Sequence, residues 1–183
     1  MKHFKFVILL SILSTSVFAQ TQTWKNSLNQ TLSEFKSCMA SEGKLQCDGY
    51  TSQAIREVYN IKEFKNKADQ SDMSPYEIQQ YVSKSSDWVK LGPAYNSETL
   101  RKAQQLSNEG KPVIVVLEDE SKSDVHVSVV LPGELQSSGS WGMKVPSVSA
   151  FFTHNPSNSF VDKSISYAYT KSMMLRLQVY TKK

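Results

Sequence analysis

Hydrophobic residues follow a helical period in the first half of the chain. From Trp24 to Met39 they recur at steps of three or four, which predicts one amphipathic helix. A second helix is predicted to begin at Cys47 or Asp48 after a break at Gly43. Its predicted buried face comprises Ala54, Ile55, Val58 and Tyr59.

Two further helices are predicted from their start and stop signals. Ser74 precedes Pro75, and Glu77 follows three residues after the serine, which is the pattern of an N-cap with a capping box. A helix from Glu98 to Leu106 is expected to end before Gly110.

The second half has the pattern of strands. The β-branched run Pro112–Glu118 predicts a buried central strand, and Val125–Leu131 predicts its neighbour after a polar turn. Weaker strand signals cover Trp141–Phe152, Ser164–Thr170 and Met173–Thr181. Helices followed by an antiparallel meander predict an α+β domain.

The first 19 residues resemble an export signal rather than part of the fold. A basic start at Lys2 and Lys5 precedes an apolar run from Phe6 to Leu13, and cleavage is expected after Ala19. The run is too short for a membrane span, so no membrane anchor is expected. We therefore expect a signal peptide over 1–19, a single domain over 20–183, and a periplasmic or secreted protein.

Composition and charge support an ordinary globular domain. The chain has 183 residues, is 39% hydrophobic and 21% charged, and has no repeat or low-complexity segment. Removing 19 of 183 residues leaves 164, and Lys+Arg falls from 21 to 19 against 17 Asp+Glu. The net charge falls from +4 to +2, with both signs interspersed, so a nucleic-acid partner is not expected. No spacing typical of metal ligands occurs, and neither a metal nor a cofactor is predicted.

Two cysteines and two histidines remain as candidate chemistry. Cys47 is predicted at the start of a helix, where amides and the helix dipole stabilise a thiolate and could hold an oxyanion. A thiolate nucleophile needs an imidazole as its base. His126 lies within a predicted strand, whereas His154 lies in a polar loop, so His126 is the preferred partner.

The residues that carry this chemistry resemble a known family. Cys47-Asp48-Gly49-Tyr50, followed by His126-Val127-Ser128-Val129-Val130, is similar to the pattern of NlpC/P60 and CHAP-type cysteine peptidases and amidases. The resemblance covers about residues 45–60 and 110–142. It implies a papain-like fold, with N-terminal helices packed on an antiparallel sheet, and hydrolysis of amide bonds, mostly in peptidoglycan peptide stems.

The resemblance also implies roles for individual residues. Cys47 would be the nucleophile, its backbone amide would help to hold the oxyanion, and His126 would be the base. The family's aspartate before the cysteine is Gln46 here. For the third catalytic position, Glu134 is the first candidate and Ser140 and Asn155 are alternatives. Trp88, Tyr95 and Trp141 are candidate groove aromatics. The implied partner is peptidoglycan or a peptide. If the enzyme is delivered against other cells, a cognate inhibitor protein is a further expected partner. The protein is expected to be a monomer.

A different class of function also fits the two cysteines. Exported proteins commonly pair their cysteines, and the nine-residue separation of Cys38 and Cys47 permits a disulfide. The chain would then be a non-catalytic periplasmic binding or inhibitory protein.

Overall fold

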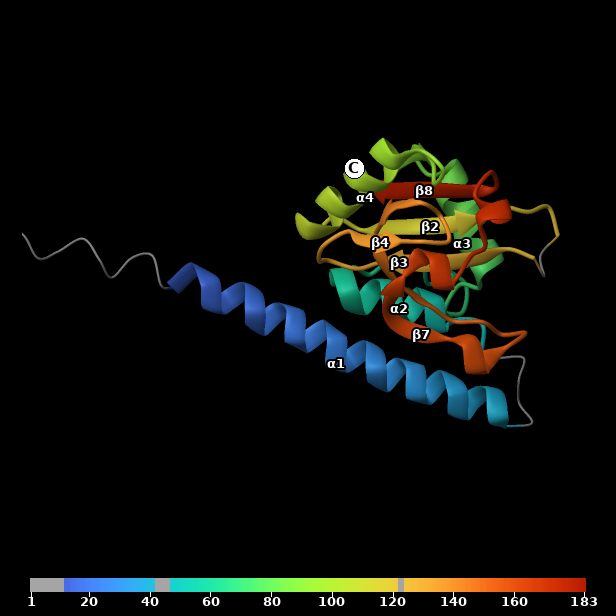
Figure 1. Ribbon diagram of the computed structural model, residues 1–183. Coiled ribbons are helices and arrows are strands. Elements are labelled where there is room, and N and C mark those ends of the chain that lie inside the picture. Colours follow the sequence, from blue (N-terminus) through green and yellow to red (C-terminus); the bar gives the residue numbers. More distant parts are fainter. Residues whose placement is uncertain (1–11, 42–46, 122–123) are drawn as a thin grey trace, which may run out of the picture.

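A computed structural model describes residues 12–41, 47–121 and 124–183, with side chains from Trp24 onward. The predicted signal peptide over 1–19 lies largely outside the described residues. The first described helix, α1 (Ile12–Ala40), begins within it, and the first turns of α1 extend away from the rest of the molecule (Figure 1). Among the described residues, no helix combines the length and apolar character that a membrane span requires.

The other helices agree with the sequence pattern in kind and differ at their ends. They are α2 (Tyr50–Tyr59), α3 (Pro75–Lys84) and α4 (Ser97–Asn108). Helix α3 has the expected capping box, because Ser74 Oγ accepts from the Glu77 amide and the Glu77 carboxylate accepts from the Ser74 amide. Helix α2 begins at Tyr50, with Gly49 as its N-cap, so Cys47 precedes the helix instead of starting it.

An antiparallel sheet of six strands forms the centre of the molecule, in the order β1-β8-β2-β3-β6-β7. Its strands are β1 (Trp88–Pro93), β2 (Val113–Leu117), β3 (His126–Val130), β6 (Ser147–Ala150), β7 (Phe160–Ser164) and β8 (Leu177–Lys182). A separate hairpin contains β4 (Gln136–Ser138) and β5 (Met143–Val145). The α+β prediction is confirmed.

Two strand predictions need correction, and one strand was not predicted. The expected strand Trp141–Phe152 is two strands, β5 and β6, separated by Pro146, which has no amide hydrogen for a ladder. The expected strand Ser164–Thr170 is wrong: β7 ends at Ser164, and the short 3-10 helix η3 (Ile165–Tyr167) follows. The edge strand β1 was not predicted, and β8 lies between β1 and β2, so the sheet is not a simple meander.

Two hydrophobic clusters pack on opposite faces of the sheet. Helices α1, α2 and α3 cover one face and meet Ile114 and Val116 of β2. Helix α4 packs on the other face with Val113, Val115 and Leu117 of the same strand. Figure 1 shows α1 and α2 on one side of the sheet and α4 on the other. Since side chains alternate along a strand, the face of every sheet residue is fixed by its position.

Candidate functional site

Cys47 shortly precedes α2 and His126 is the first residue of β3, and these two elements begin at the same end of the molecule. At the far end of this pair of elements, Tyr59 near the end of α2 donates a hydrogen bond to the carbonyl of Val130 at the end of β3. At the near end, the Phe35 ring contacts both Tyr50, the first residue of α2, and Phe151, whose carbonyl lies 3.2 Å from His126 Nε2. Helix α2 and strand β3 therefore run in the same direction.

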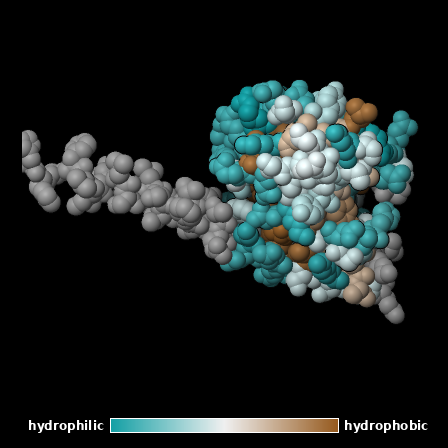
Figure 2. Space-filling model, viewed as in Figure 1, coloured by the Kyte–Doolittle hydropathy of each residue, from teal (hydrophilic) through white to brown (hydrophobic). Residues whose placement is uncertain are grey.

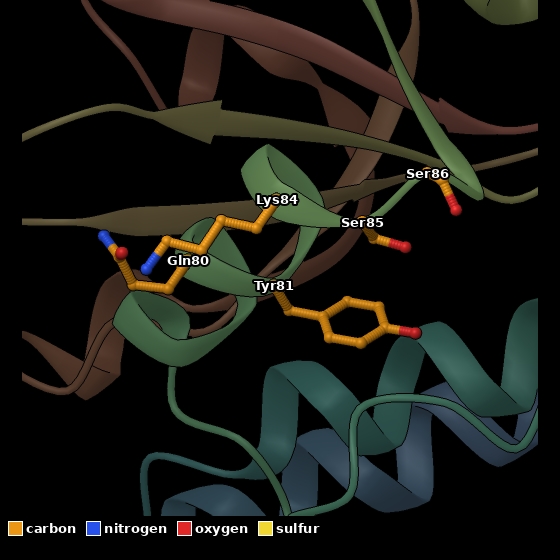
Figure 3. Close-up of a pocket in the computed structure, with 5 residues that line it drawn as sticks. All are labelled: Gln80, Tyr81, Lys84, Ser85 and Ser86. Atoms are coloured by element: carbon orange, nitrogen blue, oxygen red, sulfur yellow. The ribbon is translucent and has the colours of Figure 1, made fainter.

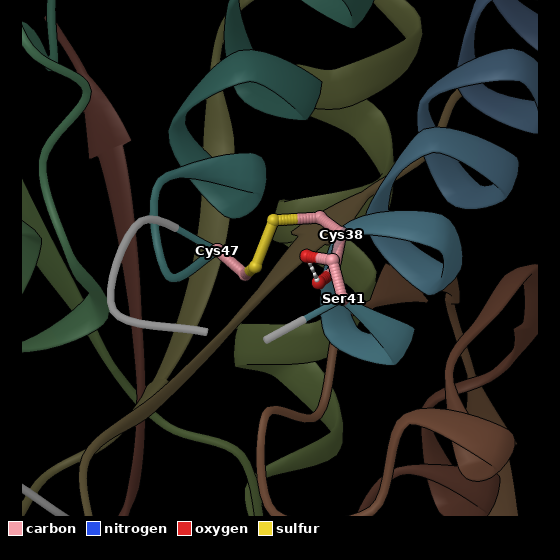
Figure 4. The surroundings of a disulfide bond; sticks show 3 residues. All are labelled: Cys38, Ser41 and Cys47. Carbon is pink, nitrogen blue, oxygen red and sulfur yellow. Dashed lines mark hydrogen bonds between the residues drawn. A yellow bond between two sulfur atoms is a disulfide. The ribbon is translucent and has the colours of Figure 1, made fainter. Parts of the chain in front are cut away.

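Cys47 is joined to Cys38 by a disulfide (Figure 4). The two Cα atoms are 5.9 Å apart, and Cys47 is completely buried. A sulfur in a disulfide has no proton to lose and is not a thiolate, so in this form Cys47 is not the predicted nucleophile. Its amide also precedes the N-cap of α2, which removes the helical basis for the predicted oxyanion role. The alternative prediction, a Cys38–Cys47 disulfide, is the one that the structure contains.

His126 faces away from Cys47. Cys47 packs in the cluster that contains α1, α2, Val127 and Val129, whereas His126 alternates with these valines and points to the α4 side of the sheet. There its ring stacks on Phe152, with centroids 4.2 Å apart. Among the described residues, no hydrogen bond or ring contact joins His126 to Cys47. The predicted Cys–His pair is therefore not assembled.

The side chain of His126 belongs to a different polar group. Its Nδ1 lies 2.7 Å from Tyr169 Oη, and that hydroxyl lies 2.8 Å from Ser128 Oγ. A carbonyl can only accept, so Nε2 carries the proton toward Phe151, and Nδ1 accepts from Tyr169. Tyr169 can then accept from Ser128. Sequence reasoning missed Tyr169 because it follows η3, far along the chain from β3.

Among the described residues, no hydrogen bond joins His126 to any of the three candidates for the third catalytic position. Glu134 follows the far end of β3, while His126 begins that strand. Ser140 lies in the β4–β5 turn, with its hydroxyl 3.2 Å from Ser138 Oγ. Asn155 is the N-cap residue of η2 (Pro156–Asn158) and accepts from Ser157. The hydroxyl of Tyr169 occupies the position beside Nδ1 that an orienting residue would need.

The enclosed environment of His126 makes stability depend on pH. Burial lowers the pKa of His126 from 6.5 to about 4, and its bond to the Phe151 carbonyl opposes this shift only in part. His126 therefore binds a proton near pH 6.5 in the unfolded chain, but only near pH 4 in the folded chain. As pH falls from 7 to 4, we expect His126 to remove about 2–3 kcal/mol of stability.

Urea unfolding at pH 7, 6, 5 and 4 checks this expectation against His126→Gln. Carboxylates also titrate in this range, so the informative quantity is the difference between the two proteins. The variant should lose less stability than the wild type on acidification. Parallel profiles would contradict the assignment of this pH dependence to His126.

A polar groove of about 720 Å³ opens at the start of α2. Asp48, Gly49, Tyr50 and Gln53 form one side. The remaining lining residues come from the loop before α3 and from its first turn: Lys65, Asn66, Gln70, Ser71, Asp72, Ser74 and Glu77. A Cβ on Gly49 would come within 2.6 Å of Asp72 Cβ, so only glycine allows the two segments to approach this closely.

The charges of the groove are mainly negative. Three carboxylates and one lysine line it. Asp72 is paired with Arg56 at 2.8 Å and with Lys65 at 3.1 Å, and Glu77 is held by the capping box. Asp48 is exposed and makes no ion pair within the described residues. It is the carboxylate most available to a ligand.

A second hollow, of about 470 Å³, lies near the end of α3 (Figure 3). Its lining residues are Gln80, Tyr81, Lys84, Ser85 and Ser86. Gln80 and Lys84 point to one side while Tyr81 points to the other, so their polar groups do not converge on one ligand. The groove at α2 is the better candidate site.

The aromatic residues proposed for a groove lie elsewhere. Trp88 and Trp141 are buried core residues, and the Trp141 indole donates to the carbonyl of Tyr169. Tyr95 is 51% exposed, and like Tyr167 and Leu175 it is one of the large hydrophobic residues that reach the surface. On the face shown in Figure 2, hydrophobic residues form small separate patches among hydrophilic ones. Tyr50 is the aromatic residue that lines the groove.

No family model matches this chain, and no curated protein matches it.

Proposed function

We propose that this protein is an exported, non-catalytic binding protein that holds a peptide in the groove at the start of α2. One observation carries the proposal: Cys47 is buried in a disulfide, while a polar groove opens directly after it. In this proposal, the disulfide fixes the edge of the groove that binds the peptide. An inhibitory protein would use the same surface to bind a segment of its target.

Two features support export. The start of the sequence has the layout of a signal peptide, and its cysteines pair as they do in oxidising compartments. Disulfides of this kind are rare in the cytosol, where thiols are kept reduced.

The lining of the groove indicates the chemistry of the ligand. Gln53, Asn66 and Gln70 present side-chain carbonyl oxygens that can accept from the N–H groups of a peptide, while their amino groups donate within the protein. The exposed carboxylate of Asp48 favours an ammonium group on the ligand. A short peptide with a free amine has both features, and the peptide stems of peptidoglycan belong to this class.

Replacing Asp48 tests this proposal. A lysine-containing tetrapeptide is expected to bind Asp48→Asn about three- to fivefold more weakly than the wild type, the size typical of an exposed charge pair. Isothermal titration calorimetry at low salt measures the difference. The same peptide with its amines acetylated should bind both proteins equally.

Glu134→Gln is the matched control, because it removes a carboxylate at the opposite end of β3 from the groove. It should bind the tetrapeptide as the wild type does. If neither the free nor the acetylated peptide bound the wild type, the proposal would be wrong.

A cysteine amidase or peptidase with a papain-like fold is the second candidate. The observation in its favour is that Cys47 and His126 lie at the same ends of α2 and β3. This activity would require an open disulfide and a rearrangement of β3 that brings His126 to the Cys47 side of the sheet. Incubating the reduced protein and its Cys47→Ala variant with peptidoglycan fragments tests it by mass spectrometry. Cleavage by the reduced wild type alone would favour the enzyme over the binding protein.

A further inference from the structure

We propose that Cys38 is a thiol-exchange site through which a dithiol reductant opens the Cys38–Cys47 bond and weakens the groove. The reductant is a protein or small molecule that carries two neighbouring thiols. The effect on affinity rests on the proposed binding function, whereas the site of attack and the loosening of the groove do not.

The two cysteines differ in exposure. Cys47 is completely buried, whereas Cys38 is only partly buried near the end of α1. Figure 4 shows Cys38 beside Ser41, whose amide and hydroxyl both donate to the Cys38 carbonyl. Thiol exchange depends on access to the attacked sulfur, so an incoming thiolate reaches Cys38 first.

The exchange balances in two steps. A thiolate of the reductant attacks Cys38 Sγ, the Sγ–Sγ bond breaks, and the electron pair leaves on Cys47 Sγ, which takes up a proton. The second thiol of the reductant then loses its proton and attacks the reductant's first sulfur, the bond from that sulfur to Cys38 Sγ breaks, and the electron pair leaves on Cys38 Sγ, which takes up a proton. This step forms the reductant's own disulfide and leaves Cys38 as a thiol. The protein gains two electrons and two protons, and the reductant loses them.

The groove depends on this bond because its first lining residues follow Cys47 directly. Asp48, Gly49 and Tyr50 are the next three residues of the chain. The N-cap of α2 is a glycine, which has no side chain to cap the helix, so the start of α2 lacks a common anchor. The disulfide supplies one by joining Cys47 to the end of α1. Opening it should therefore loosen Asp48–Tyr50 and lower the affinity of the groove.

The site of attack is tested with a monothiol, which stops at the mixed disulfide. The oxidised protein is incubated with glutathione, quenched in acid, digested and mapped by mass spectrometry. The adduct is expected on Cys38, with Cys47 free. An adduct mainly on Cys47 would overturn the assignment.

The coupling to the groove is tested by hydrogen exchange and by binding. On reduction, amides of residues 48–53 should exchange about tenfold faster, while those of α4 should not change. The affinity for the lysine-containing tetrapeptide should fall by about three- to tenfold, which is up to 1.4 kcal/mol. Cys38→Ala/Cys47→Ala should respond to the reductant in neither measurement.

The outcomes separate this inference from the proposed function. Unchanged exchange at residues 48–53 after complete reduction would overturn the coupling, even if the peptide bound. Faster exchange with unchanged affinity would overturn the effect on binding. If the oxidised protein bound no peptide, the proposed function would fail, while the adduct and exchange data would still decide the redox part.

Discussion

Replacing Phe35 with alanine is expected to lower the free energy of unfolding by about 3–5 kcal/mol. Phe35 is fully buried on α1, and its ring makes edge contacts with Tyr50 and Phe151 at centroid distances of 5.6 and 5.5 Å. It thus joins α1 to the start of α2 and to the sheet. Removing the ring leaves a cavity where three elements meet. Urea unfolding followed by circular dichroism measures the loss.

Tyr167→Ala is the matched control, because it also removes an aromatic ring but from a side chain that is 72% exposed. It should change stability by less than about 0.5 kcal/mol. A loss below about 1 kcal/mol for Phe35→Ala would contradict the packing of α1 against the sheet. Comparing the two variants shows whether the loss of stability comes from removing a buried ring or from removing any aromatic ring.

Removing the disulfide should also lower the stability of the protein. Cys38→Ala/Cys47→Ala is expected to lose about 2–3 kcal/mol, since the bond closes a short loop and restricts the unfolded chain. For a domain of this size, the melting temperature should fall by about 4–12 °C. Differential scanning calorimetry on the oxidised protein and on the variant measures the shift.

Reducing the wild type provides an independent check on this second prediction. Dithiothreitol should lower the melting temperature of the wild type to about that of the double variant, and it should leave the variant unchanged. If reduction had no effect on the wild type, the bond would not constrain the unfolded chain as expected. The comparison separates loss of the covalent link from any effect of the alanine side chains.

The local elements could be predicted because their signals lie within a few residues of one another. The capping box at Ser74 and Glu77 contains both of its partners within one helical turn. The run that became β2 is hydrophobic throughout, and the run that became β3 is rich in valine, as expected of buried strands. Strand β1 was not predicted, because β8, the strand with which it pairs, lies more than eighty residues later in the sequence.

The sequence did not indicate which face of the sheet His126 lies on. His126 and Ser128 alternate with Val127 and Val129 along β3, but both faces of the sheet are covered by helices, so this alternation alone did not show which face meets α2. Because α2 packs against Val127 and Val129, His126 lies on the opposite face, toward α4. The tertiary structure also brings Tyr169 to the ring, a contact across 43 residues of sequence.

By itself, the sequence determined that the chain forms helices and an antiparallel sheet in an α+β domain. It also identified Cys47 and His126 as residues with potential chemistry. Only the tertiary structure decided their state. A nine-residue separation allows a free thiol or a disulfide, and the packing of α1 against α2 brings the two Cα atoms to 5.9 Å, within bonding range. Whether a cysteine is a nucleophile or a covalent link depends on this distance, which local pattern does not encode.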